Sequence, residues 1–242
     1  KVPPISYHNV KDKYLGLTPG NKIIFEIKGI SYKFPTGYQA LHPFDLREES
    51  GRLIAIMGSS GAGKSTLLSV LNGTNKPTTG SVTINGIDLH REAERLEGTI
   101  GFVAQDDLLI EELTVFQNLY FNAKLCFSTF SESQLRNKVE NTLNELGLSS
   151  IRDQVVGDAL NPSISGGQRK RLNIALELMR EPSILFVDEP TSGLASLDSE
   201  NVMDLLKDMT NKGKLVFVVI HQPSSELFKL FDKLLLLDTG GY

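Results

Sequence analysis

Apolar and polar positions alternate with a period of two over the first third of the chain, beginning at Lys22. This alternation predicts three short strands, with a turn at Pro35–Gly37 between the second and the third. The expected strands are Ile23–Ile27, Ile30–Phe34 and Ala40–Leu46. Residues 1–22 carry prolines and a glycine among polar residues, so they are expected to form an irregular lead-in segment.

Leu53–Met57 is a continuous apolar run, which is typical of a strand that is buried on both faces of a sheet. Further strands are expected at Ser81–Ile84, Thr99–Ala104, Ile184–Val187, Leu215–Ile220 and Lys233–Leu237. Segments with helical spacing follow some of these runs, at Lys64–Leu71 and Ser199–Lys212. Strands that alternate with helices predict a parallel α/β sheet.

A block of helices interrupts this alternation at Thr114–Arg180. Thr114-x-x-Gln117 and Ser131-x-x-Gln134 both match the capping box that opens a helix. We therefore predict an α/β core with an embedded helical subdomain at about 106–180, both within one domain at 23–242.

Composition and charge narrow the class of protein. The 242 residues are 40% hydrophobic and 22% charged, which is ordinary globular usage, and the longest apolar runs are far below the roughly 20 residues that span a bilayer. The chain as given is therefore expected to be soluble. A net charge of −4 argues against broad binding to nucleic acid. The single cysteine, Cys126, excludes an internal disulfide and is expected to be a buried structural thiol.

The most specific motif is a glycine-rich loop between the apolar run Leu53–Met57 and the helical segment Lys64–Leu71. It matches the full G-x-x-x-x-G-K-[ST] pattern of a P-loop, whose backbone N–H groups bind a polyphosphate together with the helix N-terminus that follows. Lys64 is expected to reach the β- and γ-phosphates, and the Ser65 hydroxyl is expected to ligate Mg²⁺. The nucleotide-binding residues are then Gly58, Ser59, Ser60, Gly61, Ala62, Gly63, Lys64, Ser65 and Thr66.

Two carboxylates end a second buried strand, Ile184–Val187, which leads directly into Asp188 and Glu189. Open α/β sheets bind their ligands at the carboxyl ends of their strands. Asp188 is therefore placed to hold Mg²⁺ through water, and Glu189 is placed to polarise an attacking water. A solvated acidic strand end is the alternative interpretation.

Two further polar residues end strands in the same way: Gln105 follows Thr99–Ala104, and His221 follows Leu215–Ile220. Taken alone, Gln105 is more typical of a loop residue and His221 of a structural histidine. Parallel strands place their carboxyl ends along one crevice, however, so we expect both side chains to reach a γ-phosphate held by the P-loop.

A second candidate anion site lies at Ser165, Gly166, Gly167 and Gln168, before the helical stretch Arg169–Arg180. A serine and two glycines at a helix N-terminus can bind an anion. Because the P-loop is already a complete phosphate site, this segment is expected to serve a partner copy of the domain. The alternative is a flexible helix cap without a ligand. Arg169-Lys170-Arg171 is interpreted as a solvated helix face.

Five motifs together resemble the nucleotide-binding domains of the ATP-binding cassette (ABC) family over Ile23–Asp238. They are Walker A at Gly58–Ser65, the Gln105 loop, the Ser165-Gly-Gly-Gln168 signature, Walker B at Ile184–Glu189 and the His221 switch. The amino-acid sequence of these motifs is further similar to that of the G, or White-type, subfamily. The segments that carry this second likeness are Val103-Ala-Gln105-Asp-Asp107, Gly166-Gly-Gln-Arg-Lys-Arg171, Glu189-Pro-Thr-Ser-Gly-Leu194 and Ile220-His-Gln-Pro-Ser224.

The resemblance implies a P-loop NTPase (RecA-like) fold, with a parallel-sheet core, an N-terminal antiparallel β subdomain and an inserted helical signature subdomain. It implies an ATPase that drives a membrane transporter, most simply an exporter, from the cytoplasmic face of a membrane. Two such domains would form a head-to-tail dimer, with each ATP between one P-loop and the partner's signature. A transmembrane domain, fused or separate, would be the second partner, and the chain would be a piece excised from a longer protein.

The resemblance also implies roles for individual residues. Lys64, Glu189 and His221 would be catalytic, and Mg²⁺ would be held by Ser65, Gln105 and Asp188. An aromatic residue would stack on adenine, and Phe34 fits that place best, with Tyr32 as the alternative. The segment Gln105–Glu112 would pass motion to the membrane domain.

Two positions depart from the family pattern. Ile164 stands where the signature usually begins with Leu, which is a mild apolar exchange. Ala195 stands where the loop after Walker B usually has Asp, and Asp198-Ser199 follow as if Ala195-Ser-Leu197 were inserted. Since that loop normally communicates across the dimer, a low-turnover regulatory module stays open as an alternative, although Lys64, Asp188, Glu189 and His221 are all present and activity is expected. A soluble ABC ATPase that acts on ribosomes or DNA is a separate alternative.

Overall fold

A four-stranded antiparallel sheet forms one side of the molecule. The computed structural model describes residues 22–158 and 162–238, so the predicted lead-in lies almost entirely outside the described residues. The strands run in the order β2 (Gln39–Glu49), β1 (Ile24–Lys33), β4 (Thr79–Ile84) and β5 (Ile87–Asp88). One strand, β1, replaces the two that alternation predicted, because a register shift after Ile27 lets it continue to pair with β2.

A five-stranded parallel sheet forms the centre. Its order is β6 (Ile100–Val103), β7 (Ile184–Asp188), β8 (Leu215–Val219), β3 (Leu53–Gly58) and β9 (Lys233–Leu237). All of its neighbouring strands pair in parallel, as predicted from the alternation of strands and helices. The carboxyl ends of its strands consequently lie along one edge.

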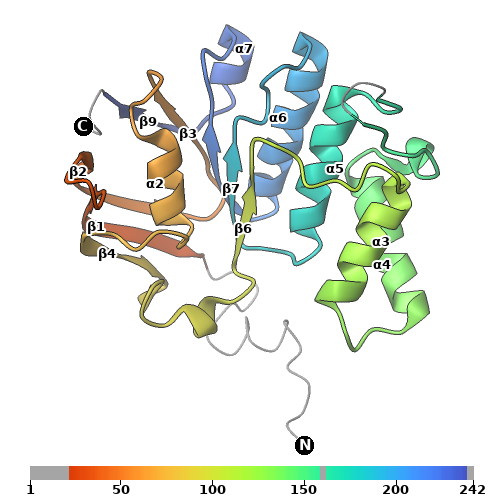
Figure 1. Cartoon of the computed structure of the whole chain (residues 1–242), viewed down its shortest axis with the longest axis horizontal. Helices are drawn as coiled ribbons and strands as arrows, with labels where there is room; N and C mark the ends of the chain where they lie inside the picture. The colour runs from red at the N-terminus through yellow and green to blue at the C-terminus, as the bar shows by residue number, and fades with distance from the viewer. Residues whose placement is uncertain (1–21, 159–161, 239–242) are drawn as a thin grey trace, which may run out of the picture.

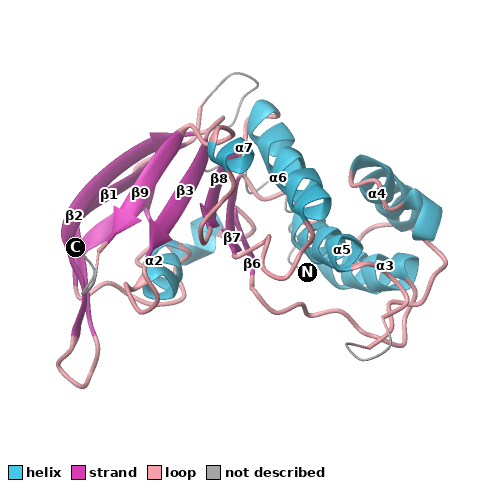
Figure 2. Cartoon of the chain, turned by 90° about the horizontal axis from the view of Figure 1, so that it is seen from above, coloured by secondary structure: helices cyan, strands magenta, loops and turns pink. Residues whose placement is uncertain are grey.

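Helices lie on both faces of the parallel sheet (Figures 1 and 2). On one side, α2 (Lys64–Leu71) lies within the curve of the antiparallel strands. On the other side α6 and α5 lie next to the sheet, and α3 and α4 lie beyond them. The bounds of these helices and of the short α7 are α3 (Val115–Cys126), α4 (Glu132–Glu145), α5 (Gly166–Leu178), α6 (Ser196–Asn211) and α7 (Ser225–Phe228); 3₁₀ turns lie at Ala93–Leu96 and Ser149–Ile151.

Both predicted capping boxes are confirmed. The Thr114 hydroxyl accepts from the Gln117 N–H while the Gln117 side chain accepts from the Thr114 N–H, and Ser131 and Gln134 make the same exchange. Each box satisfies two N–H groups that the first turn of a helix leaves unpaired. The expected burial of Cys126, at the end of α3, is also confirmed.

The two faces of the parallel sheet belong to two separate cores. Along β3, Leu53 and Ala55 pack toward the helical block, whereas Ile54 and Ile56 pack toward α2 and the antiparallel sheet. Burial on both faces explains why these strands read as continuous apolar runs. Within the described residues, no helix is both long enough and apolar enough to cross a membrane.

An aromatic cluster joins the antiparallel sheet to the parallel one. Phe186 and Phe217 stack with ring centroids 4.9 Å apart, and Phe25 of β1 lies 5.4 Å from Phe217. All three rings are fully buried.

We predict that Phe217→Ala lowers the free energy of unfolding by about 3–5 kcal/mol, because it removes a buried ring between two sheets and leaves a cavity. Urea unfolding followed by circular dichroism measures this change. The control Phe228→Ala truncates a ring that is 49% exposed and should cost less than about 1 kcal/mol. Equal losses in the two variants would contradict this account of the core.

Candidate nucleotide site

The predicted P-loop joins β3 to α2 and packs closely against its neighbours. A Cβ on Gly58 would lie 2.4 Å from the Leu237 carbonyl oxygen, and one on Gly63 would lie 2.9 Å from the Ala40 carbonyl oxygen. Gly63 also has φ +97°, a conformation that favours glycine. These glycines let the loop curl between β2 and β9 and start α2.

Lys64 is buried at the start of α2, and its ammonium group closes the loop on itself. Its Nζ donates to the carbonyl oxygens of Gly58, at 2.9 Å, and of Ser59, at 2.8 Å. A phosphate in the loop would compete for these donors, since charge-assisted bonds to an anion are stronger than bonds to neutral carbonyls.

A pocket of about 290 Å³ lies beside this loop. Its lining brings together residues from β2, the P-loop, the end of β7 and the end of β8. They are Phe34, Tyr38, Ala40, Ser60, Gly61, Gly63, Lys64, Ser65, Thr66, Glu189 and His221. The P-loop and the two strand ends that the sequence singled out therefore share one cavity.

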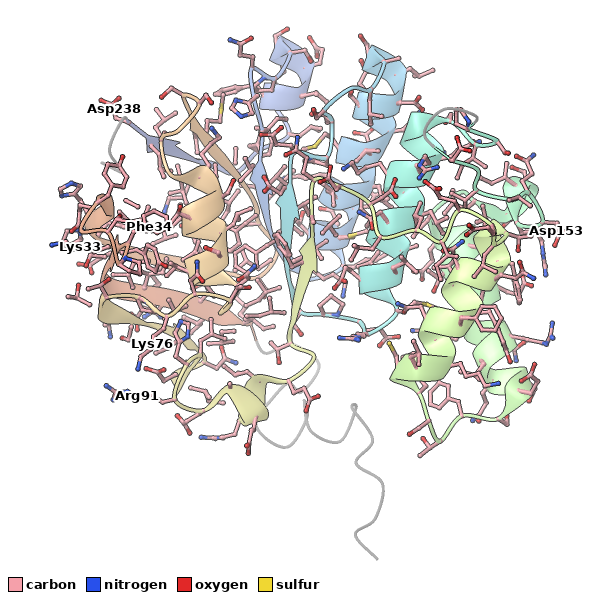
Figure 3. The ribbon with its side chains drawn as sticks, in the orientation of Figure 1. Lys33, Phe34, Lys76, Arg91, Asp153 and Asp238 are labelled. Atoms are coloured by element: carbon pink, nitrogen blue, oxygen red, sulfur yellow. The ribbon has the colours of Figure 1, made fainter. Side chains whose placement is uncertain are left out.

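Aromatic rings form one wall of this pocket, at the hairpin between β1 and β2, where Figure 3 labels Phe34 next to Lys33. Phe34 lines the pocket, whereas Tyr32, whose ring meets Phe34 edge-on at 5.2 Å, is not part of its lining. Tyr38 lines the pocket as well, and its ring lies 6.4 Å from that of Phe34 at an interplanar angle of 21°. Sequence reasoning missed Tyr38, although its place directly after the Pro35–Gly37 turn was a usable signal.

Glu189 is where three strand ends meet. Its Oε1 lies 2.9 Å from Nε2 of His221, and its Oε2 accepts a hydrogen bond of 3.3 Å from Nε2 of Gln105. These contacts confirm that Gln105, Glu189 and His221 lie along one crevice. Glu189 has φ 45°, which is uncommon for a residue with a side chain and turns the chain sharply at the end of β7.

Asp188 lies directly before this junction, at the last position of β7. Burial raises the pKa of its carboxyl above the ordinary value, and the neighbouring charge of Glu189 raises it further. Lys170, Lys64 and His221 act in the opposite direction. A cation bound beside these two adjacent, partly buried carboxylates would stabilise their charged forms.

The Ser165–Gln168 segment opens α5 with a third capping box. The Ser165 hydroxyl accepts from the Gln168 N–H, and the Gln168 side chain accepts from the Ser165 N–H. The cap interpretation is therefore correct as a description of the local structure. Among the described residues that line the pocket, no member comes from this segment, so α5 presents its N-terminus elsewhere.

The start of α6 packs on the same helix. A Cβ on Gly167 would lie 2.3 Å from a carboxylate oxygen of Asp198, so only glycine allows this approach. Ser196 and Leu197 form the first turn of α6, with Ala195 as its N-cap, and the apparent insertion at Ala195-Ser-Leu197 is therefore not an added loop. Ala195 has no side-chain acceptor for the first N–H groups of α6.

The prediction that Arg169-Lys170-Arg171 is a solvated face is wrong for its first two residues. Arg169 donates from Nε and Nη2 to the two carboxylate oxygens of Asp107, at 3.0 and 3.2 Å. Lys170 donates from Nζ to the carbonyl oxygen of Gln105, at 2.8 Å. Both side chains therefore form hydrogen bonds to the segment that follows β6.

Comparison with known proteins decides the family. The family model described as ABC transporter matches residues 41–192, which hold the P-loop, Gln105, the Ser165 segment and both carboxylates. The chain belongs to the ABC transporter family. The cassette is an ATPase module.

Curated relatives confirm the likeness to the G subfamily. The chain is 43% identical to ABC transporter G family member 13 of Arabidopsis thaliana, over 79% of this chain and 28% of that protein. It is 37% identical to human ATP-binding cassette sub-family G member 5, over 84% of this chain and 31% of that protein. It is 44% identical to ABC-type transporter claG of Penicillium crustosum, over 79% of this chain and 26% of that protein. The chain thus spans between a quarter and a third of the length of these relatives.

Solved structures confirm the predicted fold class. The cassette resembles cbiO1 of Clostridium perfringens, part of the ABC transporter complex cbiONQ, with a TM-score of 0.80, 27% identity and coverage of 91% of this chain and 86% of that one. It also resembles a bacterial ABC transporter cassette solved as a dimer, with a TM-score of 0.75, 29% identity and coverage of 89% and 95%.

The predicted magnesium ligands fit a Mg²⁺ ion by their chemistry. Among the described residues, no three His, Cys, Asp or Glu side chains gather into a site that holds a metal alone. The predicted set of Ser65, Gln105 and Asp188 instead offers a hydroxyl, an amide and one carboxylate. Oxygen ligands with few carboxylates suit Mg²⁺ that arrives with nucleotide phosphates.

Proposed function

We propose that this cassette is the ATP-hydrolysing motor of a membrane exporter, and that it works as a head-to-tail dimer. The observation that supports it most is the Glu189 carboxylate, which lies in the P-loop pocket between Gln105 and His221. A carboxylate held in this way at a phosphate site is suited to activate a water for attack on a γ-phosphate.

Binding is assigned to the P-loop and the aromatic wall. The backbone N–H groups of Gly61–Ser65 and the N-terminus of α2 receive the phosphates, and Lys64 exchanges the carbonyl oxygens of Gly58 and Ser59 for the β- and γ-phosphates. Phe34 stacks on the adenine ring, since its exposed face borders the same pocket.

Hydrolysis is assigned to the strand ends. Glu189 accepts a hydrogen bond from the attacking water and polarises it. His221 contacts one oxygen of this carboxylate and Gln105 contacts the other, and together they hold it in place. Mg²⁺, when bound with ATP through Ser65, Gln105 and Asp188, neutralises charge on the phosphates.

The second copy is required because the signature is not in the pocket of its own chain. The first turn of α5, which starts at Gly166 and Gly167, contributes no residue to the lining of the P-loop cavity, so its helix N-terminus can receive an anion only from elsewhere. The structural relative solved as a dimer shows that cassettes of this fold pair. A dimer that places Ser165 of each copy against the γ-phosphate of the other completes both sites.

The membrane partner is assigned to the surface around the segment that follows β6. This region exposes apolar side chains that a membrane domain can cover: Leu108 is 79% exposed and Ile110 51%. The cassette would thereby lie on the cytoplasmic face of a membrane. The acidic net charge disfavours the alternative of an ATPase that acts on ribosomes or DNA.

A regulatory module with little turnover is the second candidate, and one observation favours it. Ala195, which opens α6, offers no side chain to the N–H groups of that helix or to a facing copy. Coupling between two ATP sites would then be weak.

The experiment that tests the proposal is Glu189→Gln. We expect this variant to bind ATP normally, to lose nearly all hydrolysis because the amide is a poor base, and to accumulate an ATP-dependent dimer. Phosphate release measures the first effect and analytical ultracentrifugation the second. The control Glu226→Gln, on the exposed surface of α7, should hydrolyse ATP at the parental rate. Parental turnover in Glu189→Gln would overturn the assignment.

A pH dependence follows from Asp188. Its pKa is raised, chiefly by burial, so its carboxyl takes up a proton at a higher pH than an exposed aspartate does. The protonated form lacks the charge that attracts Mg²⁺, and magnesium-dependent ATP affinity should therefore rise with pH over the range just above the ordinary value of 3.8. Asp188→Asn should remove this rise. A fluorescent ATP analogue titrated at fixed Mg²⁺ measures it, and the same rise in Asp188→Asn would contradict the role.

A further inference from the structure

Two cations lie close to the N-terminus of α5. Arg169 and Lys170 follow the N-cap Ser165 by four and five residues, and the first turn contains no acidic residue. A helix N-terminus bears partial positive charge, which mildly disfavours positive side chains near it. Contacts outside the helix can offset this cost.

Arg169 makes such a contact with Asp107. Its guanidinium spans both carboxylate oxygens, at 3.0 and 3.2 Å, and its Nη1 donates to the carbonyl oxygen of Gly157, at 2.5 Å. The Arg169 side chain is only 14% exposed and that of Asp107 is 26% exposed. A bidentate pair in a half-buried place fixes geometry as well as charge.

Lys170 binds the same segment at Gln105, two residues before Asp107. Its Nζ donates to the carbonyl oxygen of Gln105 at 2.8 Å. Burial lowers the pKa of Lys170, whereas the carboxylates of Asp107, Asp106 and Asp188 favour its charged form. The ammonium group thus lies among the acidic groups of the site while it binds a backbone oxygen.

The segment held by these two cations leads into the hydrolytic crevice. In Figure 1 the chain that leaves β6 crosses α5 on its way to α3. At the start of this crossing, the Gln105 backbone is bound by Lys170 and the Gln105 side chain donates to Glu189 at 3.3 Å. Gln105 thus contacts both α5, through its backbone, and the carboxylate of Glu189, through its side chain.

We propose that Arg169 and Lys170 are positioning residues for ATP hydrolysis, which hold Gln105 against Glu189 from the signature helix. The inference rests on the proposed function, since it assigns Glu189 to hydrolysis. Because α5 presents its N-terminus to the ATP of the partner, the same helix connects both ATP sites of a dimer. An incoming partner nucleotide that moves α5 would move Gln105 with it.

Kinetics test this link through its dependence on Gln105. In the parental chain, Arg169→Gln and Lys170→Met should each lower kcat for ATP hydrolysis on the order of tenfold to a hundredfold, as expected for misplaced groups. The dissociation constant for a fluorescent ATP analogue should stay within about twofold. In a Gln105→Ala background the same substitutions should cause little further loss, since the group they position is already absent.

Matched variants separate positioning from general damage. Arg136→Gln breaks an exposed ion pair with Glu132 on α4 and should leave kcat unchanged. Lys170→Arg keeps a cationic donor and should retain most of the activity. The proposal would be overturned if the kcat losses of Arg169→Gln and Lys170→Met multiplied with the loss of Gln105→Ala. It would also be overturned if neither Arg169→Gln nor Lys170→Met changed kcat in the parental chain.

A second measurement needs no turnover. Urea midpoints of Arg169→Gln, Asp107→Asn and the double variant form a cycle, and the double variant should shift the midpoint no further than the larger single shift. If the midpoint shifts of the two single variants added up in the double variant, Arg169 would not hold this segment through Asp107, and the proposal would be overturned. If the parental chain binds ATP but hydrolyses none, the proposed function fails on its own, and the cycle still decides whether Arg169 and Asp107 act as a pair.

Discussion

The parallel register of β6, β7 and β8 is the constraint on which the rest of this molecule depends. Val103 lies opposite Val187, and Asp188 lies opposite Val219, so the residues that follow these strands emerge at one edge. Glu189 is there approached from one side by Gln105 and from the other by His221. Segments more than 80 positions apart in the sequence are thereby joined at one carboxylate. Chemistry at this edge needs the sheet to be intact, which ties function directly to the apolar cores on its two faces.

The N-terminal part of helix α5 makes three kinds of contact. Its Ser165–Gln168 box satisfies the helix end, its Gly167 lies against Asp198 of α6, and its cations bind the segment that leaves β6. The crowding of these contacts explains how a local sequence of about six residues can relate two nucleotide sites to each other.

Much of this arrangement could be predicted from local signals. Capping boxes at Thr114 and Ser131 depend on contacts within a few residues, and the apolar run Leu53–Met57 can be read directly from the sequence; each is confirmed. Other features depend on contacts between distant segments, which no local pattern shows. Arg169 and Lys170 look like surface cations until the segment of Asp107 is folded across them. Tyr38 joins the pocket because the β1–β2 hairpin brings its ring to Phe34 and because the P-loop, a later segment, lines the same cavity.

A structure of this chain with Mg²⁺ and a non-hydrolysable ATP analogue tests the account most directly. It should show Lys64 Nζ moved from the carbonyl oxygens of Gly58 and Ser59 onto the phosphates, with Glu189 facing the γ-phosphate. A second copy should lie with its Ser165 against that same phosphate. Nucleotide bound outside the P-loop pocket, or a γ-phosphate remote from Glu189, would contradict the claim that the strand ends form a hydrolytic site.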